Sequence, residues 1–137
     1  MNAMTEASRI IPMLIVDNMQ AALRFYAEVL GGTPIYQYPE NSDPSFITLR
    51  CGNSDVALSL LRTTLPMNVS FRPAIGHRIQ LCVNVADVDE SVAALRSINS
   101  TVVLEPSDQP WGERAAYVED PDGNLVLLVS RLKERRA

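Results

Sequence analysis

The sequence repeats one order of strand, helix and strands, and this repeat limits the possible folds more than any other feature. Val16-Asp17-Asn18-Met19, where a strand gives way to a helix, matches Val85-Ala86-Asp87-Val88 at an offset of 69 residues. The strand segment Leu58-Ser59-Leu60 matches Val126-Leu127-Leu128 at an offset of 68. Nearly equal offsets at both ends of the unit indicate two modules with the same order of elements.

Each module is predicted to hold one strand, one helix and three further strands. In the first copy the strands fall at about 10–16, 33–38, 45–51 and 56–61, and the helix is capped by Asn18 and ended by Gly31-Gly32. In the second copy they fall at about 77–85, 101–104, 114–118 and 125–130, and the helix is capped by Asp87. We therefore predict an α+β fold of two tandem βαβββ modules.

The division of the chain follows from the same pattern. Residues 1–137 are expected to form a single domain, with module one at about 8–62, a linker at about 63–76 and module two at about 77–131. Each module covers one sheet face with its own helix and leaves the other face free. Pairing the modules is expected to close these faces into a curved sheet around a cleft.

Composition excludes several classes of function. A net charge of −4 and a pI of about 4.9 argue against nucleic-acid binding, since the basic residues cluster only at 131–136. No apolar run reaches the length of a membrane span, and residues 1–6 lack the pattern of a signal peptide. Cys51 and Cys82 are not in a CxxC motif and are expected to stay reduced. A cytoplasmic protein is predicted.

Several motifs resemble one known family when they are taken in order. Ile11-Pro12-Met13-Leu14-Ile15-Val16-Asp17-Asn18, then Ala22-Leu23-Arg24-Phe25-Tyr26 and Val29-Leu30-Gly31-Gly32, are followed late in the chain by Trp111-Gly112-Glu113-Arg114 and Tyr117-Val118-Glu119-Asp120-Pro121-Asp122-Gly123-Asn124. This set resembles the vicinal-oxygen-chelate superfamily, which includes glyoxalases, bleomycin resistance proteins and ring-cleaving dioxygenases. The resemblance runs from about residue 10 to 131 and implies the tandem βαβββ fold. On physical grounds alone, Asp-Pro-Asp-Gly predicts a turn and Phe25 a core position.

The resemblance also implies a metal site with two ligands from each module. Aligned on the motifs, the ligand positions fall on Ile11, Ser59, Gln80 and Leu127, and a two-residue slip would put Arg78 in the third position. Ile11 and Leu127 have no lone pair to offer a divalent ion, and a neutral Ser59 is a poor ligand. We therefore predict that no metal binds at the usual place and that the protein uses no cofactor.

His77 is the one histidine of the sequence and precedes the third ligand position. Because side chains alternate along a strand, its parity places it on the face opposite Gln80. A shift of one residue in the register would bring it into the cleft, so this contact stays open at the level of the sequence.

The cleft is predicted from strand alternation to be apolar with a few polar groups, as is usual for a small-molecule pocket. The residues that share a face with the vacant ligand positions are Ile11, Met13, Ile15, Ala57, Ser59, Leu61, Arg78, Gln80, Cys82, Leu125, Leu127 and Val129. The candidate ligand-binding residues are Met13, Ser59, Arg78, Gln80, Trp111 and Tyr117, and Arg50 is a further candidate for an anionic group.

Three functions remain open. The first is a metal-independent protein that binds a small organic ligand, such as an antibiotic or a metabolite, as a homodimer. The second is a lyase, isomerase or dioxygenase-like enzyme that uses the cleft, with or without a divalent metal; the predicted cleft contains no Glu or Asp to act as a general base. The third is a structural or regulatory module whose cleft is filled by its own side chains. Catalytic residues are therefore not assigned.

Overall fold

The computed structural model describes residues 8–60, 64–65, 69–70, 76–77 and 79–132. Arg78 and Leu61, both assigned to the cleft from the sequence, lie outside the described residues.

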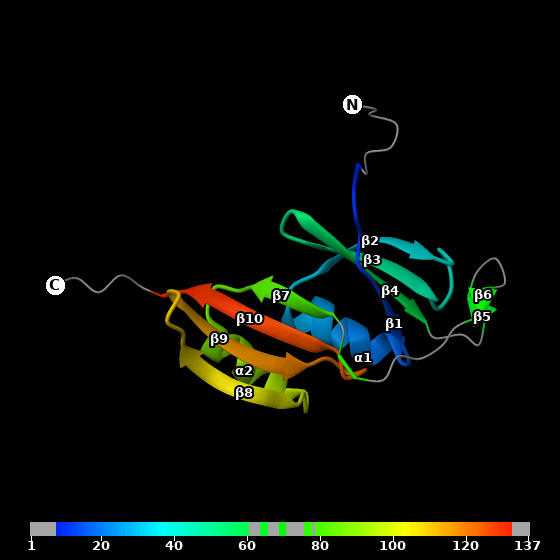
Figure 1. The fold of residues 1–137 in the computed structure, drawn as a ribbon. Coiled ribbons are helices and arrows are strands. Elements are labelled where there is room, and N and C mark those ends of the chain that lie inside the picture. Colours follow the sequence, from blue (N-terminus) through cyan, green and yellow to red (C-terminus); the bar gives the residue numbers. More distant parts are fainter. Residues whose placement is uncertain (1–7, 61–63, 66–68, 71–75, 78, 133–137) are drawn as a thin grey trace.

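The described residues form two four-stranded sheets, a two-stranded sheet and two helical segments (Figure 1). Module one contains β1 (Met13–Val16), α1 (Met19–Leu23), the π-helix η2 (Arg24–Val29), β2 (Thr33–Tyr38), β3 (Phe46–Cys51) and β4 (Ser54–Leu60). Module two contains β7 (Gln80–Asn84), α2 (Val88–Ser97), β8 (Val102–Asp108), β9 (Glu113–Glu119) and β10 (Leu125–Arg131). Between them, β5 (Thr64–Leu65) and β6 (Val69–Ser70) pair with each other.

The two sheets have the same strand order, β1-β4-β3-β2 and β7-β10-β9-β8. In each sheet the first strand runs parallel to the last strand of its module, and the other pairs are antiparallel. The α+β fold of two βαβββ modules is therefore confirmed. The exact module boundaries stay a prediction.

The helices begin where the sequence predicts but differ in form. The Asn18 side chain accepts a hydrogen bond from the Ala21 amide at 3.0 Å, and Asp87 accepts one from the Glu90 amide at 3.1 Å. These bonds satisfy amides that have no partner within the helix. The first helix then widens into η2, where the Leu30 amide donates to the Phe25 carbonyl five residues back, whereas α2 remains a regular α-helix.

The first strand of each module is shorter than predicted. β1 begins at Met13 rather than near residue 10, and β7 begins at Gln80 rather than near residue 77. At β1 the reason is Pro12, which has no N–H to donate, although its carbonyl accepts a hydrogen bond from the Ala57 amide at 2.9 Å. The pattern of apolar residues thus continues beyond the hydrogen-bonded ladder.

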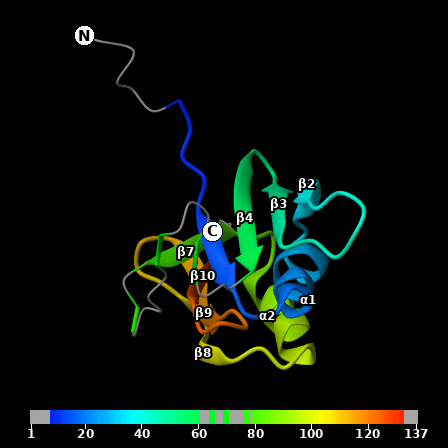
Figure 2. The same cartoon turned by 90° about the vertical axis from the view of Figure 1, so that its right-hand side faces the viewer.

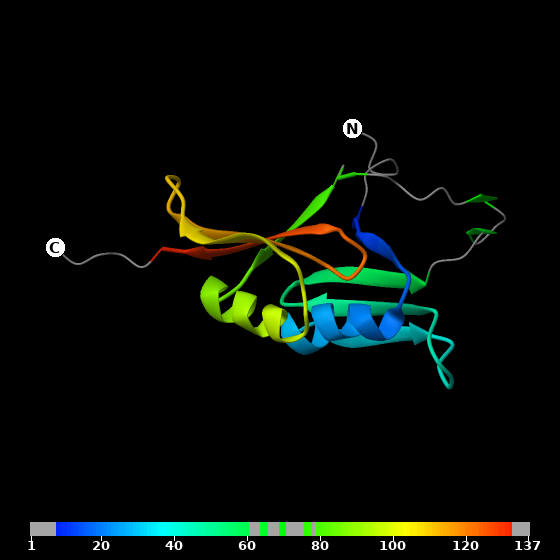
Figure 3. The same cartoon turned by 90° about the horizontal axis from the view of Figure 1, so that it is seen from below.

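The core lies between the sheets and the helices. Figure 3 shows the two helical segments end to end. The largest fully buried side chains are Phe25, Leu49, Leu58, Leu95, Leu128, Val16, Val88, Val92, Val118 and Val126. They come from both modules and belong to one continuous cluster, which confirms the predicted core position of Phe25.

A polar contact joins the two modules beside this core. The Tyr26 hydroxyl on η2 donates a hydrogen bond to Asp120 Oδ2 at 2.6 Å, although Asp120 is only 4% exposed. The Asp120 carboxylate also accepts bonds from the Asp122 amide and from the Asn124 amide and side chain, at 2.8–2.9 Å. In addition, the Asp17 amide donates to Asp122 Oδ1 at 2.9 Å. We call Asp17, Tyr26, Asp120, Asp122 and Asn124 the inter-module clasp.

Within the residues that the structure describes, no helix is long and apolar enough to cross a membrane.

Candidate functional site

The candidate site lies on the sheet faces that point away from the helices, which we call the outer faces. In module one the strand register places Met13 beside Ala57 and Ile15 beside Ser59. Strand alternation and the remaining pairs complete the outer face of module one: Met13, Ile15, Tyr36, Tyr38, Phe46, Thr48, Arg50, Asp55, Ala57 and Ser59. Tyr36 and Phe46 stack edge to face across this surface, with ring centroids 6.0 Å apart.

The outer face of module two follows from the same argument. Gln80 lies beside Leu125, and Leu127 lies between Cys82 and Tyr117. The full set is Gln80, Cys82, Asn84, Leu104, Ser107, Glu113, Ala115, Tyr117, Glu119, Leu125, Leu127, Val129 and Arg131. Both outer faces are thus mainly apolar, with isolated polar and charged groups.

The structure places four of the predicted binding residues on these faces, two on each module. Met13 and Ser59 lie on the outer face of module one, and Gln80 and Tyr117 lie on that of module two. Trp111 lies in the turn before β9, is 64% exposed, and donates from Nε1 to Glu113 Oε1 at 2.9 Å. The assignment of a binding role to each of these residues stays a prediction.

His77 lies outside the strand that was predicted to contain it. Its Nε2 donates a hydrogen bond to the Gly123 carbonyl at 3.0 Å, and the ring is exposed. The histidine therefore contacts the turn between β9 and β10.

The residues at the family's ligand positions do not fit a divalent ion. Ile11 lies two residues before Met13 and so is level with Asp55, while Ser59 lies four residues further along β4, roughly 13 Å away. In module two, Gln80 lies beside Leu125, so Leu127 is its diagonal neighbour across the β7–β10 pair. Two of these four side chains carry no donor atom, and among the described residues no three His, Cys, Asp or Glu side chains gather as a metal site.

Three carboxylates on the outer faces were missed from the sequence. Asp55 lies two residues before Ala57, Glu113 lies four residues before Tyr117, and Glu119 lies beside Leu125, so all three share the parity of the predicted cleft residues. Strand alternation carried the signal, but the predicted strands began after Asp55 and Glu113 and ended before Glu119. The outer faces therefore do contain acidic groups.

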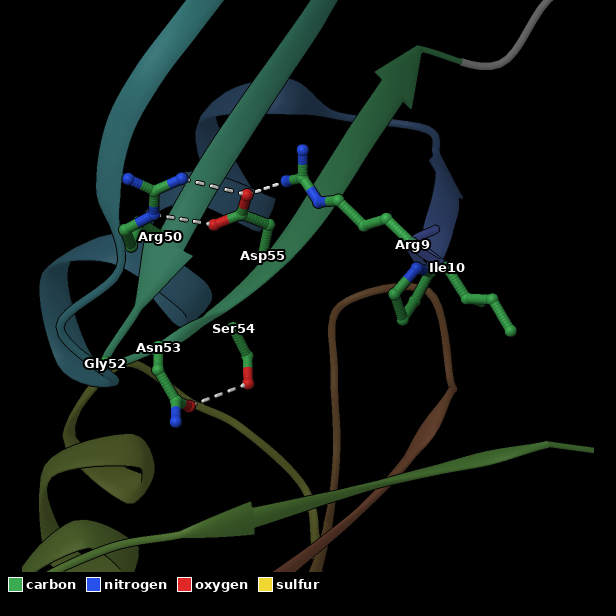
Figure 4. A pocket seen from close by; sticks show the side chains of 8 residues that line it. Arg9, Ile10, Arg50, Gly52, Asn53, Ser54 and Asp55 are labelled. Carbon is green, nitrogen blue, oxygen red and sulfur yellow. Dashed lines mark hydrogen bonds and ion pairs between the residues drawn. The ribbon is translucent and has the colours of Figure 1, made fainter. Parts of the chain in front are cut away.

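A pocket of about 800 Å³ lies at the Asp55 end of module one (Figure 4). We call it the arginine pocket, and it is lined by Arg9, Ile10, Pro12, Arg50, Gly52, Asn53, Ser54 and Asp55. Arg50 and Arg9 both pair with Asp55, from β3 and from the segment that precedes β1. The positive groups are thus concentrated at one end of this outer face.

A second pocket of about 460 Å³ lies between the β3–β4 turn and β7. Both cysteines line it, Cys51 from module one and Cys82 from module two, and both are free thiols. Burial raises the pKa of the Cys51 thiol, which makes its reactive thiolate form scarcer at neutral pH. We assign no chemistry to these thiols.

Among the described residues, β1 pairs only with β4 and β7 only with β10, so each has one edge without a partner strand. The Pro12 carbonyl points to β4, so the backbone groups of Met13 and Ile15 point to the opposite side. The Val85 amide donates to the Val129 carbonyl, so the backbone groups of Cys82 and Asn84 point away from β10. Figure 2 shows the two sheets as separate layers that share no strand.

Comparison with known proteins gives one family and a consistent set of relatives. Residues 9–128 match the family described as the Glyoxalase/Bleomycin resistance protein/Dioxygenase superfamily. An uncharacterised protein of Mycobacterium bovis is 28% identical over 127 residues, covering 90% of this chain and 83% of the relative. A bleomycin resistance protein of Geobacillus stearothermophilus is 24% identical over 135 residues, covering 90% of this chain and 96% of that protein.

Solved structures agree with this match. The crystal structure of TioX from Micromonospora sp. ML1 has a TM-score of 0.72 at 25% identity, covering 92% of this chain and 100% of that one. A superfamily member from Sphaerobacter thermophilus has a TM-score of 0.68 at 27% identity, covering 92% and 98%.

Proposed function

Because the chain belongs to the Glyoxalase/Bleomycin resistance protein/Dioxygenase superfamily, we propose that it binds a small organic molecule without a metal and sequesters an antibiotic or a metabolite. The observation that carries this proposal is the composition of the outer faces. They present large apolar side chains to solvent, including Met13 at 58% exposure, together with isolated polar groups. Such surfaces suit an organic ligand, whereas the side chains at the family's ligand positions do not suit a metal.

The protein acts as a homodimer in this proposal. The outer faces expose Ile11, Met13, Tyr36, Tyr38 and Leu104. In the part of the chain that the structure describes, β1 and β7 each have one edge without a partner strand. A second copy of the chain would cover this apolar surface and enclose a ligand between two outer faces. The two free thiols are in keeping with a reducing compartment, and we place the protein in the cytoplasm.

Titration calorimetry tests ligand binding directly. A panel of antibiotics that includes cationic glycopeptides of the bleomycin class is titrated into the protein, with and without a chelator. We expect one class of compound to bind and the affinity to be unchanged by the chelator. Binding that disappears with the chelator, or flat traces for every compound, would argue against the proposal.

Two variants locate the ligand on the outer faces. Met13→Arg and Gln80→Arg each add a long charged side chain at an exposed position, so neither is expected to unfold the protein. Both are expected to weaken binding at least about tenfold, because a long charged side chain would cover the apolar surface and lose water when the ligand binds. Ala93→Arg on the exposed side of α2 is the matched control and is expected to change nothing. Equal affinities in all three variants would place the ligand elsewhere.

The oligomeric state has its own test. Light scattering coupled to size-exclusion chromatography should give twice the mass of the chain. A monomer at concentrations that saturate the ligand site would contradict the dimer.

Glu113 favours a second candidate, a lyase or isomerase that uses the same faces. Its carboxylate lies on the outer face of module two with Tyr117, and Trp111 holds it by a hydrogen bond. A carboxylate there can act as a general base, which the residues first assigned to the cleft lacked. If the ligand found by calorimetry is turned over, Glu113→Gln should abolish turnover and leave binding intact. A ligand recovered unchanged after long incubation would exclude this candidate.

A further inference from the structure

The arginine pocket contains more positive than negative charge. Arg50 donates from Nε to Asp55 Oδ1 at 2.9 Å and from Nη2 to Oδ2 at 3.2 Å, and Arg9 donates to the same Oδ2. Figure 4 shows the two guanidinium groups on either side of one carboxylate. The Asp55 side chain is 6% exposed, while each arginine side chain is 53% exposed. One buried carboxylate therefore forms ion pairs with two exposed guanidinium groups.

Many of the N–H donors in this pocket have no partner among the described residues. A guanidinium carries several N–H groups in a rigid fork and stays charged at any physiological pH. Arg50 uses Nε and Nη2 on Asp55, and Arg9 uses Nη2. Within the described part of the chain, neither arginine contacts a second carboxylate. The remaining N–H groups, and the excess positive charge, are thus available to an acceptor that enters the pocket.

The walls of the pocket suit an organic anion. Ile10 lies beside Arg9, and the Gly52-Asn53-Ser54 turn lines the other end (Figure 4). Pro12 adds a second apolar lining residue. A molecule with an acidic group on a carbon skeleton can place its oxygens on the guanidinium groups and its carbons on the apolar side. The pocket also continues onto the outer face, since Arg50 and Asp55 share that face with Ala57.

We propose that the arginine pocket is a subsite for an anionic oxygen group, a carboxylate or a phosphate, carried by the small molecule that the protein binds. The assignment to that molecule rests on the proposed function, whereas anion binding by the pocket does not. Carboxylate and phosphate oxygens accept charge-assisted hydrogen bonds from the paired N–H groups of arginine. The subsite selects acidic or zwitterionic ligands over purely cationic ones, although the chain as a whole carries a net charge of −4.

Nuclear magnetic resonance titration of ¹⁵N-labelled protein tests the pocket with defined probes. Benzoate, phenyl phosphate and inorganic phosphate are added at constant ionic strength, and benzamide serves as the neutral analogue of benzoate. We expect saturable shifts of the Arg9 and Arg50 Nε–H signals and of the amides at 52–55 with the anions, and none with benzamide. Tighter binding of benzoate identifies a carboxylate ligand, and tighter binding of phenyl phosphate a phosphate ester.

Three glutamine variants separate a binding role from a structural one. Arg9→Gln and Arg50→Gln each leave Asp55 with one arginine, so the fold is expected to be kept. Each should weaken anion binding about tenfold through the loss of a charged donor. Arg96→Gln is the control, because Arg96 is equally exposed at 53% but pairs with Glu105 on the surface. Anion affinities that match the control, or shifts that do not saturate, would reduce Arg9 and Arg50 to a structural ion pair.

The outcomes also separate this proposal from the proposed function. Gln80→Arg is expected to block the outer face of module two and leave the arginine pocket in module one intact, so anion shifts in that variant report on the pocket alone. Ligand binding that is unaffected by Arg9→Gln and Arg50→Gln would overturn the subsite and leave the proposed function standing.

Discussion

Module one and module two share an order of elements but use equivalent positions differently. Tyr26 in module one corresponds to Leu95 in module two, and Asp120 in module two corresponds to Cys51 in module one, both at an offset of 69. The Tyr26–Asp120 pair is a buried hydrogen bond, whereas Leu95 is fully buried and Cys51 is a half-buried thiol. A repeated pattern of strands and helices thus permits a polar contact at one position and apolar side chains at its counterpart.

The strand pairs correct one offset of the repeat. Met13 lies beside Ala57 in module one, and Cys82, its counterpart at an offset of 69, lies beside Leu127 in module two. Thr48 and Tyr117, also 69 residues apart, lie on the other side of Ala57 and Leu127. The strand β4 thus matches β10 at an offset of 70 and not 68, and the two modules share one register. The repeat constrains the order of strands and the face of each residue, because a two-residue shift preserves parity.

The largest expected effect on stability comes from removing the buried Asp120 carboxylate. Asp120→Ala removes the acceptor of four hydrogen bonds at a buried position and leaves the Tyr26 hydroxyl without a partner. We expect a loss of about 3 kcal/mol in the free energy of unfolding, measured by denaturant titration. The matched control is Cys51→Ala at the corresponding position, which should cost less than about 1 kcal/mol. Equal losses would mean that the two turns contribute alike.

A smaller effect is expected when only the inter-module bond is lost. Tyr26→Phe removes the hydroxyl and leaves Asp120 its three bonds within the turn, so the expected loss is about 1–2 kcal/mol in the same titration. Tyr117→Phe on the outer face is the control and should be close to neutral. If Tyr26→Phe behaves like this control, the clasp does not stabilise the contact between modules.

The two helix caps are expected to contribute equally to stability, in contrast to the Tyr26 and Asp120 positions. Asn18→Ala and Asp87→Ala each remove one side-chain acceptor at the start of a helix. Both are expected to lower the melting temperature by a similar amount, corresponding to about 1 kcal/mol. Asn53→Ala, in an exposed turn, is the control. A much smaller loss at Asn18 would indicate that the π-helix weakens the capping of α1.

The smallest effect concerns the pH dependence of the clasp. Burial raises the pKa of the Asp122 carboxyl in the folded protein, since its Oδ2 is buried without a partner among the described residues. A raised folded pKa means that the folded state holds the proton more tightly, so this group disfavours folding as pH rises from its unfolded pKa through its folded pKa. Asp122→Asn should remove this dependence and raise stability at neutral pH by less than about 1 kcal/mol, because the residue is partly exposed.

Stability curves of Asp122→Asn and the parent protein between acidic and neutral pH provide the measurement. Curves that run parallel would contradict the assignment. Asp89→Asn is an informative control because the contribution of Asp89 to stability depends on pH in the opposite direction. Hydrogen bonding by Arg114 lowers the pKa of Asp89, so its contribution is present above the unfolded pKa and lost as pH falls through the folded pKa.

Much of the fold could be predicted from the sequence because it depends on periodicity. The apolar spacing of the two helices, the caps Asn18 and Asp87, and the alternation along the strands each have a local signal. The clasp had no such signal, since Tyr26 and Asp120 are 94 residues apart and neither breaks its local pattern. The sequence alone therefore predicts no polar partner for Tyr26 and only a turn at Asp120.

The candidate site was predicted only in part for a related reason. Alternation assigned Met13, Ser59, Gln80 and Tyr117 to faces that the strand register now defines. It could not find the arginine pocket, because Arg9 precedes the first strand and approaches Asp55 only once β1 and β4 have paired. Side-chain contacts that depend on the register of distant strands require the tertiary structure.

The clasp also has a consequence for dividing the chain into fragments. Asp120 accepts three of its four hydrogen bonds from its own turn, so a fragment that contains only module two would keep this carboxylate largely satisfied. A fragment that contains only module one would expose the Tyr26 hydroxyl together with the buried surface around Phe25. If the fragments are expressed separately, module two should be the more tolerant of isolation, and mixing the two should restore the Tyr26–Asp120 bond.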